Sequence, residues 1–308
     1  MSDSICGLGR AEKNKCLFKS EIKILAEAFN AIIKNKSDKL DPNGDDLFDR
    51  IMQQTKCTDE MCVVDRMLKL AKGTEFESLI YRIRELAFKL EGPGDLAALL
   101  DSFILFRVGR QIAYNTKPPG RIVFGGVLTY DFNTPPATST WAHPEAIVRS
   151  WLEDKWGQMH FIFNTDHRAG EGVHWTALAI SPESGTIEYF DSYGELPRSG
   201  FVKGTPTSAL PDGMFLSLMQ EWINAVILAF GKINKHIKFT YNETTHQEDS
   251  DRSNCGPYCL LYLVWRAKKH TLDEINKSPI SQEMITSMRE KLYIPASDYD
   301  FPIPKNIE

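Results

Sequence analysis

The motif NCGPYC, residues 254–259, has the composition expected around a reactive cysteine. Asn254 is a favoured N-cap residue and Pro257 is tolerated in a first helical turn, so a helix should begin at Cys255 and run into the apolar stretch LLYLVWRA. The backbone N–H groups of that turn and the positive end of the helix dipole would stabilise a thiolate. The Cys255 N–H would also donate to a developing oxyanion, and Gly256 would let a substrate approach closely.

Four roles are open to Cys255 from this segment alone: nucleophile, buried core residue, disulfide half or metal ligand. The chain has six cysteines, which are expected to be free thiols in a reducing cytosol. CTDEMC, from Cys57 to Cys62, has no second pair of ligands nearby, so thiols are favoured there over a structural metal. Cys259 should lie deeper, in the core. No metal and no cofactor is expected, and any cysteine chemistry should be catalytic.

A thiolate nucleophile needs a base that takes and returns a proton. His174 opens GVHWTALAIS, a strand apolar on both faces, and its position at the exposed end of that strand suits this role. A hydrogen-bonded structural histidine is the alternative. The next strand, TIEYFDS, returns after a short hairpin loop. A four-residue loop at 181–184 would pair His174 with Asp191, whose carboxylate would orient the imidazole. A five-residue loop would pair His174 with Ser192 and turn Asp191 to the other face.

Two more side chains are candidates for the same site. Gln247 lies eight positions before Cys255 in a polar loop, where its amide would be a second donor to the oxyanion. An ordinary exposed loop glutamine is the alternative. Trp175 follows the candidate base and is expected to pack over the substrate cleft and exclude water, or else to be a core residue.

These residues are expected on an α+β core in which short strands are separated by Gly, Pro and Asp clusters. Strands are predicted at RIVFGGVLTYDF, HFIFNTD, VHWTALAIS, TIEYFDS and HIKFTYNE, and helices over Leu96–Ala113 and Met214–Phe230. The tail IPASDYDFPIPKNIE is too rich in Pro and polar residues for regular structure.

The part of the chain before this core has helical periodicity from Lys15 to about Leu90. EGPG at 91–94 interrupts the pattern, because Gly-Pro-Gly neither continues a helix nor joins a strand well. The sequence therefore predicts a helical arm domain over 1–92 and a core domain over 93–308.

Composition argues against several classes of function. The chain has 308 residues, of which 42% are hydrophobic and 25% charged, as in ordinary soluble globular proteins. Its formal net charge of −5 does not indicate nucleic-acid binding as the main function. No signal-peptide pattern and no apolar run of about 18 residues is present, so the chain is expected in the cytosol or a continuous compartment, without a membrane partner.

Taken in order, GVHW, EYFDS, HQ and CGPYCLLYL resemble the adenain and SUMO-protease class of cysteine proteases, with catalytic order His, Asp/Glu/Asn, Gln, Cys. Within that class the chain resembles the polyprotein-processing proteases of African swine fever virus type. The resemblance implies a mixed sheet flanked by helices, a catalytic triad of His174, Asp191 and Cys255, and an oxyanion hole from Gln247 and the Cys255 N–H. Asp191 stands where the swine fever type has Asn, and the loop before Cys255 is longer here.

The resemblance also implies a function. It is that of a late viral cysteine endopeptidase that cleaves core-shell polyproteins at Gly-Gly-X sites while a large DNA virus assembles. Such an enzyme would be found in the host cytoplasm, at the viral factory, and in the virion. The alternative is a deconjugase that removes ubiquitin-like modifiers such as SUMO. A non-catalytic scaffold is a third possibility, against which the complete set of four site residues argues.

Overall fold

The computed structural model describes residues 5–8, 10, 15–33, 39–91, 98–116, 121–135, 137, 139–170, 172–195 and 214–294. The chain divides into two compact units: an arm unit, Met1–Gly94 with Lys291–Glu308, and a core unit, Asp95–Glu290. The predicted division into domains 1–92 and 93–308 stays a prediction. The compact units differ from it at the carboxyl-terminal end, which clusters with the arm. The predicted irregular tail lies outside the described residues, apart from Ile294.

The arm unit is helical, as its periodicity predicted. It contains α1 (Lys19–Ile32), α2 (Leu47–Thr55), α3 (Glu60–Leu70) and α4 (Glu77–Ala87). Its core consists of apolar side chains from one face of each helix, including Leu25, Ile51, Val63 and Ile80, all fully buried. Two short strands, β1 (Leu90–Glu91) and β7 (Tyr293–Ile294), pair in parallel.

Four of the six cysteines form disulfides in the arm unit, so the prediction of free thiols is wrong for them. Cys6 is joined to Cys16 and Cys57 to Cys62, with Cα–Cα distances of 5.0 and 5.6 Å, within the usual range for a disulfide. Cys6 also forms an antiparallel β-bridge to Phe88, which follows α4. The second pair spans the turn from α2 into α3, where the sequence favoured free thiols over a structural metal.

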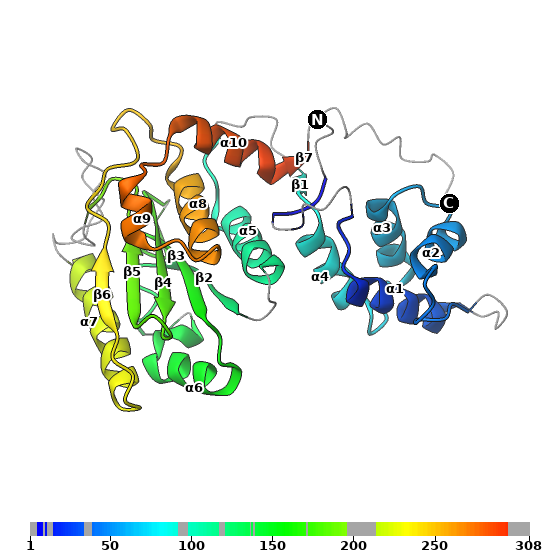
Figure 1. Cartoon of the computed structure of the whole chain (residues 1–308), viewed down its shortest axis with the longest axis horizontal. Helices are drawn as coiled ribbons and strands as arrows, with labels where there is room; N and C mark the ends of the chain where they lie inside the picture. Colours follow the sequence, from blue (N-terminus) through cyan, green and yellow to red (C-terminus); the bar gives the residue numbers. More distant parts are fainter. Residues whose placement is uncertain are drawn as a thin grey trace. The chain divides into compact units, whose positions relative to one another are not determined.

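The core unit is built on a five-stranded mixed sheet in the order β2-β3-β4-β5-β6 (Figure 1). The strands are β2 (Ile122–Thr129), β3 (Gln158–Asn164), β4 (Trp175–Ser181), β5 (Thr186–Phe190) and β6 (Lys238–Tyr241). The pairs β2/β3 and β5/β6 are parallel, and β4 is antiparallel to both its neighbours. All five predicted strands are therefore present, with small changes at their ends.

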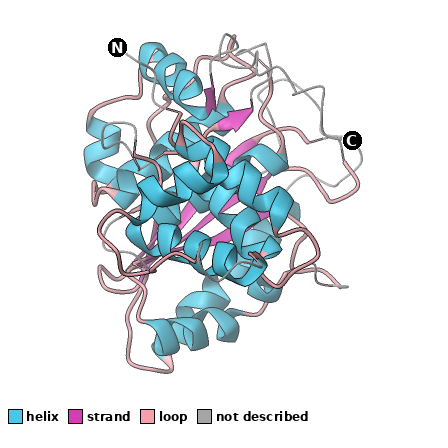
Figure 2. Ribbon diagram, turned by 90° about the vertical axis from the view of Figure 1, so that its right-hand side faces the viewer, coloured by secondary structure: helices cyan, strands magenta, loops and turns pink. Residues whose placement is uncertain are grey.

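Helices cover both faces of this sheet, whose strands are magenta in Figure 2. One face packs on α6 (Pro144–Asp154) and α7 (Met214–Gly231) through a core of aromatic side chains that includes Trp151, Phe161 and Trp222. The other face contacts α5 (Ser102–Asn115) and α8 (Cys255–Ala267). Alternate residues of each strand point to opposite faces of the sheet. Because helices cover both faces, both sets of side chains are buried, and this explains why the strands are apolar throughout.

Two predicted helices are confirmed, with a change at one start. The helix expected from Leu96 begins at Ser102, where Asp101 accepts a hydrogen bond from the Ile104 N–H and so acts as the N-cap. Three helices were not predicted: α6, α9 (Leu272–Lys277) and α10 (Gln282–Leu292). Among the described residues no helix is both long and apolar enough to cross a membrane.

A buried ion pair fixes α8 against the sheet. Arg266 of α8 lies 2.7 Å from the Glu188 carboxylate of β5, and both side chains are almost fully buried. The Tyr262 hydroxyl donates to the same carboxylate oxygen, and the Tyr262 ring stacks on Phe190. Cys255 begins α8 and Asp191 directly follows β5. These contacts between α8 and β5 therefore help to fix the position of Cys255 relative to Asp191.

Candidate active site

His174 and Asp191 meet at one end of the sheet. His174 immediately precedes β4 and Asp191 immediately follows β5, so both lie just beyond the paired strands. The His174 Nε2 is 2.9 Å from Asp191 Oδ1, and the two side chains are 4% and 8% exposed. The hydrogen bond expected from the sequence is therefore present, and it leaves Nδ1 of the imidazole for another partner.

The strand register that produces this contact differs from both registers considered from the sequence. Ser181 pairs with Thr186, so the loop has four residues but begins at Pro182. Gly185 closes it with φ +67°, a left-handed conformation that glycine adopts without strain. The change moves each strand partner by two positions. A shift of two keeps every side chain on its face, which is why Asp191 still reaches His174.

Hydrogen bonds to Tyr193 and Asn242 fix the position of Asp191. Its Oδ1 accepts a second hydrogen bond from the Tyr193 N–H, at 2.9 Å. The fully buried Asn242 accepts from the Asp191 N–H at 2.7 Å and donates to the Asp191 carbonyl at 2.6 Å. The side-chain amide of Asn242 thus binds both the N–H and the carbonyl of Asp191 and fixes its backbone. The Asp191 carboxylate therefore has a defined direction.

The His174 imidazole is positively charged over a wide pH range. Burial disfavours the charged form, but the charge and hydrogen bond of Asp191, and then the hydrogen bond and charge of Cys255, outweigh it. The pKa of His174 rises from 6.5 to about 10. An imidazolium between a carboxylate and a thiol sulfur is the arrangement that stabilises a thiolate nucleophile.

Cys255 opens α8, as predicted, and is a free cysteine. Asn254 occupies the N-cap position, but its side chain makes no cap hydrogen bond. It bonds instead to Asp251 and Arg289. Cys259 is fully buried, as expected of a core residue. Burial and the negative charges of Cys255 and Asp191 raise the pKa of the Cys259 thiol well above its ordinary value, so that it is unreactive.

Gln247 is buried, with 1% of its surface exposed, so it is not an ordinary loop glutamine. Its Oε1 accepts from the Ser192 hydroxyl at 2.6 Å, and its Nε2 donates to the Asp251 carbonyl. A glutamine amide has two N–H hydrogens, and this second bond uses one of them. Asp251 lies within the longer loop before Cys255, so that loop folds back to hold Gln247 in place. The oxyanion role of Gln247 stays a prediction.

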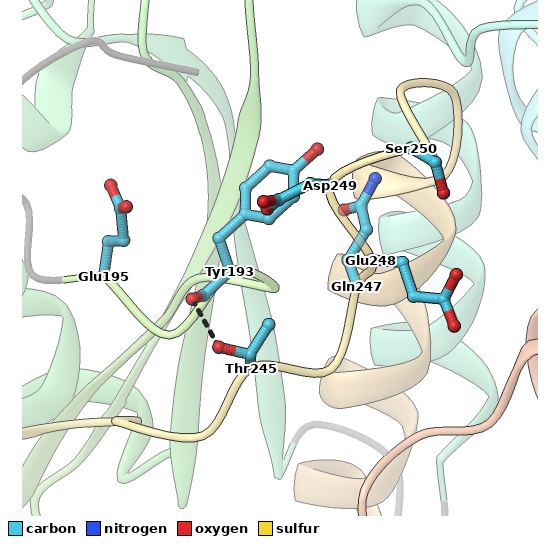
Figure 3. Close-up of a pocket in the computed structure, with 7 residues that line it drawn as sticks. All are labelled: Tyr193, Glu195, Thr245, Gln247, Glu248, Asp249 and Ser250. Atoms are coloured by element: carbon cyan, nitrogen blue, oxygen red, sulfur yellow. Dashed lines mark hydrogen bonds between the residues drawn. The ribbon is translucent and has the colours of Figure 1, made fainter. Parts of the chain in front are cut away.

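A pocket of about 530 Å³ opens beside Gln247 (Figure 3). Its lining comes from the loop after β5 and the loop before α8: Tyr193, Glu195, Thr245, Gln247, Glu248, Asp249 and Ser250. The Thr245 hydroxyl donates to the Tyr193 carbonyl at 3.1 Å and so joins the two loops. The Tyr193 ring lies 5.0 Å from the His174 ring, which connects this pocket to the candidate base.

Two predicted cleft residues have clear structural contacts. Trp175 is half-buried and donates its indole N–H to the Leu100 carbonyl at 3.0 Å. Gly256 is buried, and a Cβ there would lie 3.2 Å from Leu100 and 3.3 Å from Leu105. The close packing of these leucines explains a glycine at 256 without a substrate. A role of either residue in substrate binding stays a prediction.

Sequence reasoning missed four residues that support the site. The Tyr193 ring lies against His174, Asn242 holds Asp191, Asp251 accepts from Gln247, and Arg289 binds the loop before Cys255. Only Tyr193 had a local signal, since it follows Asp191 by two positions. Asn242 and Arg289 lie far along the chain from the residues they hold, and Asp251 acts through a backbone carbonyl; spacing does not reveal such contacts.

Comparisons with known proteins identify the same class. A family model described as the Ulp1 protease family, C-terminal catalytic domain, matches residues 134–300. A cysteine protease of African swine fever virus is 23% identical over 245 residues, covering 77% of this chain and 83% of that protein. A protein named as a SUMO-1 cysteine protease, from another isolate of that virus, is 22% identical with the same coverage.

The fold is also that of a solved structure. The crystal structure of a protease of African swine fever virus superimposes with a TM-score of 0.58 at 19% identity, covering 95% of this chain and 96% of that one. The predicted α+β fold, with helices amino-terminal to a mixed-sheet core, is thereby confirmed. The family match spans more than half of the chain and includes His174, Asp191, Gln247 and Cys255. The chain belongs to the Ulp1 protease family and is a cysteine protease.

Proposed function

We propose that this protease is a viral endopeptidase that cleaves polyproteins at Gly-Gly-X sites during assembly of a large DNA virus, with Cys255, His174 and Asp191 as its catalytic triad. The observation that carries the catalytic assignment is the buried His174–Asp191 hydrogen bond beside Cys255 at the start of α8. The viral setting is supported by two relatives, both named as cysteine proteases of African swine fever virus.

The mechanism begins from the thiolate of Cys255. Its sulfur attacks the scissile carbonyl carbon, and the oxyanion accepts hydrogen bonds from the Cys255 N–H and the remaining N–H of Gln247. The His174 imidazolium then gives its proton to the leaving amine, and a thioester remains. Neutral His174 takes a proton from water, which attacks the thioester and releases the acid. Asp191 keeps the imidazole oriented through both steps.

A panel of peptides tests the substrate proposal. Peptides containing Gly-Gly-X are compared with matched Gly-Ala-X and Ala-Gly-X peptides, and the products are located by mass spectrometry. We expect cleavage after the second glycine, with kcat/KM lowered at least about 100-fold by either alanine. In Gly-Ala-X the added β-carbon lies beside the reacting carbonyl and displaces it from the attack geometry, and in Ala-Gly-X it widens the chain that the cleft must hold. Equal cleavage of all three would contradict the Gly-Gly preference.

The second candidate is a deconjugase of ubiquitin-like modifiers, since one relative bears the name SUMO-1 cysteine protease. Reporters made from whole ubiquitin or SUMO separate the two candidates from each other. A deconjugase recognises the folded modifier, so it would cleave the whole-protein reporter far faster than the isolated carboxyl-terminal peptide. We expect similar rates for the two forms, as for a polyprotein protease.

We place the enzyme in the host cytoplasm, at the viral factory, and in the virion, because its proposed substrate is processed during assembly. Mass spectrometry of purified particles, after protease treatment of their surface, tests this location. Presence of the chain inside the particle is the expected result, and its restriction to the infected-cell lysate would contradict packaging.

A further inference from the structure

Arg289, on α10, contacts the two residues that precede Cys255. Its Nη2 donates to the Ser253 carbonyl at 2.7 Å, and its Nε donates to Asn254 Oδ1 at 2.6 Å. A third bond runs from Nη1 to the Ala98 carbonyl at 2.8 Å. The Arg289 side chain is buried, with 5% exposure for the residue. One rigid guanidinium therefore joins the loop before the nucleophile to residue 98, which is far away in the sequence.

The segment 98–100 also contacts the chain beside His174 and the chain beside Cys255. The Leu100 carbonyl accepts the indole N–H of Trp175, the residue after His174. On the opposite side, the Leu100 side chain packs closely against Gly256, the residue after Cys255. This short segment therefore contacts the residue after the base and the residue after the nucleophile, and so joins the two sides of the site.

We propose that Arg289 is a positioning residue that sets the separation and direction of the Cys255 sulfur relative to His174. It acts through segment 98–100 on the His174 side, and through Ser253 and Asn254 on the Cys255 side. The inference rests on the proposed roles of Cys255 and His174, but it does not depend on which polypeptide is the substrate.

The planar fork of arginine explains why this position needs that residue. Three of its N–H groups reach three oxygens on two separate segments at once. A lysine keeps the positive charge but presents a compact ammonium on a flexible stem, which cannot hold the same three acceptors. Arg289→Lys should therefore keep the charge in place and loosen the geometry.

The test measures Cys255 alkylation by iodoacetamide together with peptide turnover, in the full-length protein. Mass spectrometry assigns the modified cysteine, and all rates are taken well below each variant's unfolding temperature. We expect Arg289→Lys to lower kcat about 10- to 100-fold with little change in KM, since misplacement by about 1 Å has that effect. Its alkylation rate and the pH dependence of that rate should change as well.

Arg121 provides the matched control. It is an exposed arginine that pairs with Glu183 at the other end of the sheet. Arg121→Lys should leave kcat, alkylation and their pH dependence unchanged. If wild-type protein shows neither turnover nor selective alkylation of Cys255, the proposed function fails. If wild type shows both and Arg289→Lys matches it, only the positioning role fails.

A second single variant covers the case in which Arg289→Lys is unstable, and a double-mutant cycle is added where both variants fold. Asn254→Ala removes one acceptor of the guanidinium and should lower kcat in the same direction. If Arg289 acts through Asn254, the double variant should lose clearly less than the product of the two single losses. Multiplicative losses, or a loss of kcat that follows only the unfolded fraction, would overturn the proposal.

Discussion

At the scale of single residues, Asp191 and Cys255 together control the protonation of His174. Burial alone would favour neutral His174, but the Asp191 carboxylate lies 2.9 Å away, and its charge and hydrogen bond help the imidazole to keep its proton. The thiol adds to this effect, so the base of the catalytic cycle rests in its protonated form. The charge that a thiolate needs beside it is therefore present before any substrate binds.

The first prediction concerns the protonation of His174. NMR titration of its ring should give a pKa of about 10 in wild type. Cys255→Ala should lower this pKa, because the variant removes a hydrogen bond and a charge that both raise it. Since the folded-state pKa is raised, the pair stabilises the fold fully below pH 6.5, and this contribution is lost as the pH rises through about 10. An unchanged pKa in Cys255→Ala would show that the thiol does not interact with the ring.

The second prediction concerns the oxyanion donor. Gln247→Ala should lower kcat about 100- to 1000-fold and change KM little, because the lost bond forms only as the oxyanion develops. The exposed neighbour Glu248 provides a control, since Glu248→Ala should leave kcat close to the wild-type value. Steady-state kinetics on one peptide distinguish the two variants. A rise in KM with kcat unchanged would instead assign Gln247 to substrate binding.

At the scale of elements, the start of β4, the end of β5 and the start of α8 bring His174, Asp191 and Cys255 together. Apolar runs predicted the strands, and the Asn-Cys-Gly-Pro motif predicted the start of α8, because these signals are local. The hairpin register was not predictable, since it depends on whether Ser181 ends the strand or begins the turn. Only the even shift of two positions preserved the His174–Asp191 contact.

The third prediction concerns the ion pair that fixes α8. Arg266→Met should destabilise the core unit by about 3–5 kcal/mol, because it leaves the Glu188 carboxylate buried without its cation. Arg121→Met, which breaks an exposed pair with Glu183, should cost less than about 1 kcal/mol. Denaturant unfolding followed by tryptophan fluorescence measures both. Equal effects would mean that the buried pair does not fix the helix.

At the scale of the whole molecule, an enzymatic core unit is joined to a helical arm unit. Composition and periodicity predicted both parts, whereas the disulfides of the arm were missed. Free thiols were expected from the reducing compartment alone, but cysteine pairing also depends on which segments fold together. Glu60, for example, accepts hydrogen bonds from the N–H groups of Cys16 and Leu17 and so brings the amino-terminal segment onto α3.

The fourth prediction concerns those disulfides. In the chain-entropy account, opening the Cys6–Cys16 loop should destabilise the arm by about 3 kcal/mol, and opening the Cys57–Cys62 loop by about 2 kcal/mol. Hydrogen exchange in protein with both pairs replaced by serine should show lower protection in α1 to α4, with the sheet of the core unit unchanged. Unchanged protection of the arm would show that the disulfides do not stabilise it.

The most direct test of the central claim is to trap the nucleophile. A peptide ending in a Gly-Gly vinyl sulfone is added to wild type and to Cys255→Ala, and the adduct is located by mass spectrometry. The account predicts one adduct on the Cys255 sulfur, none on buried Cys259, and none in the alanine variant. Peptide cleavage that survives in Cys255→Ala, or an adduct on another residue of the folded enzyme, would contradict it.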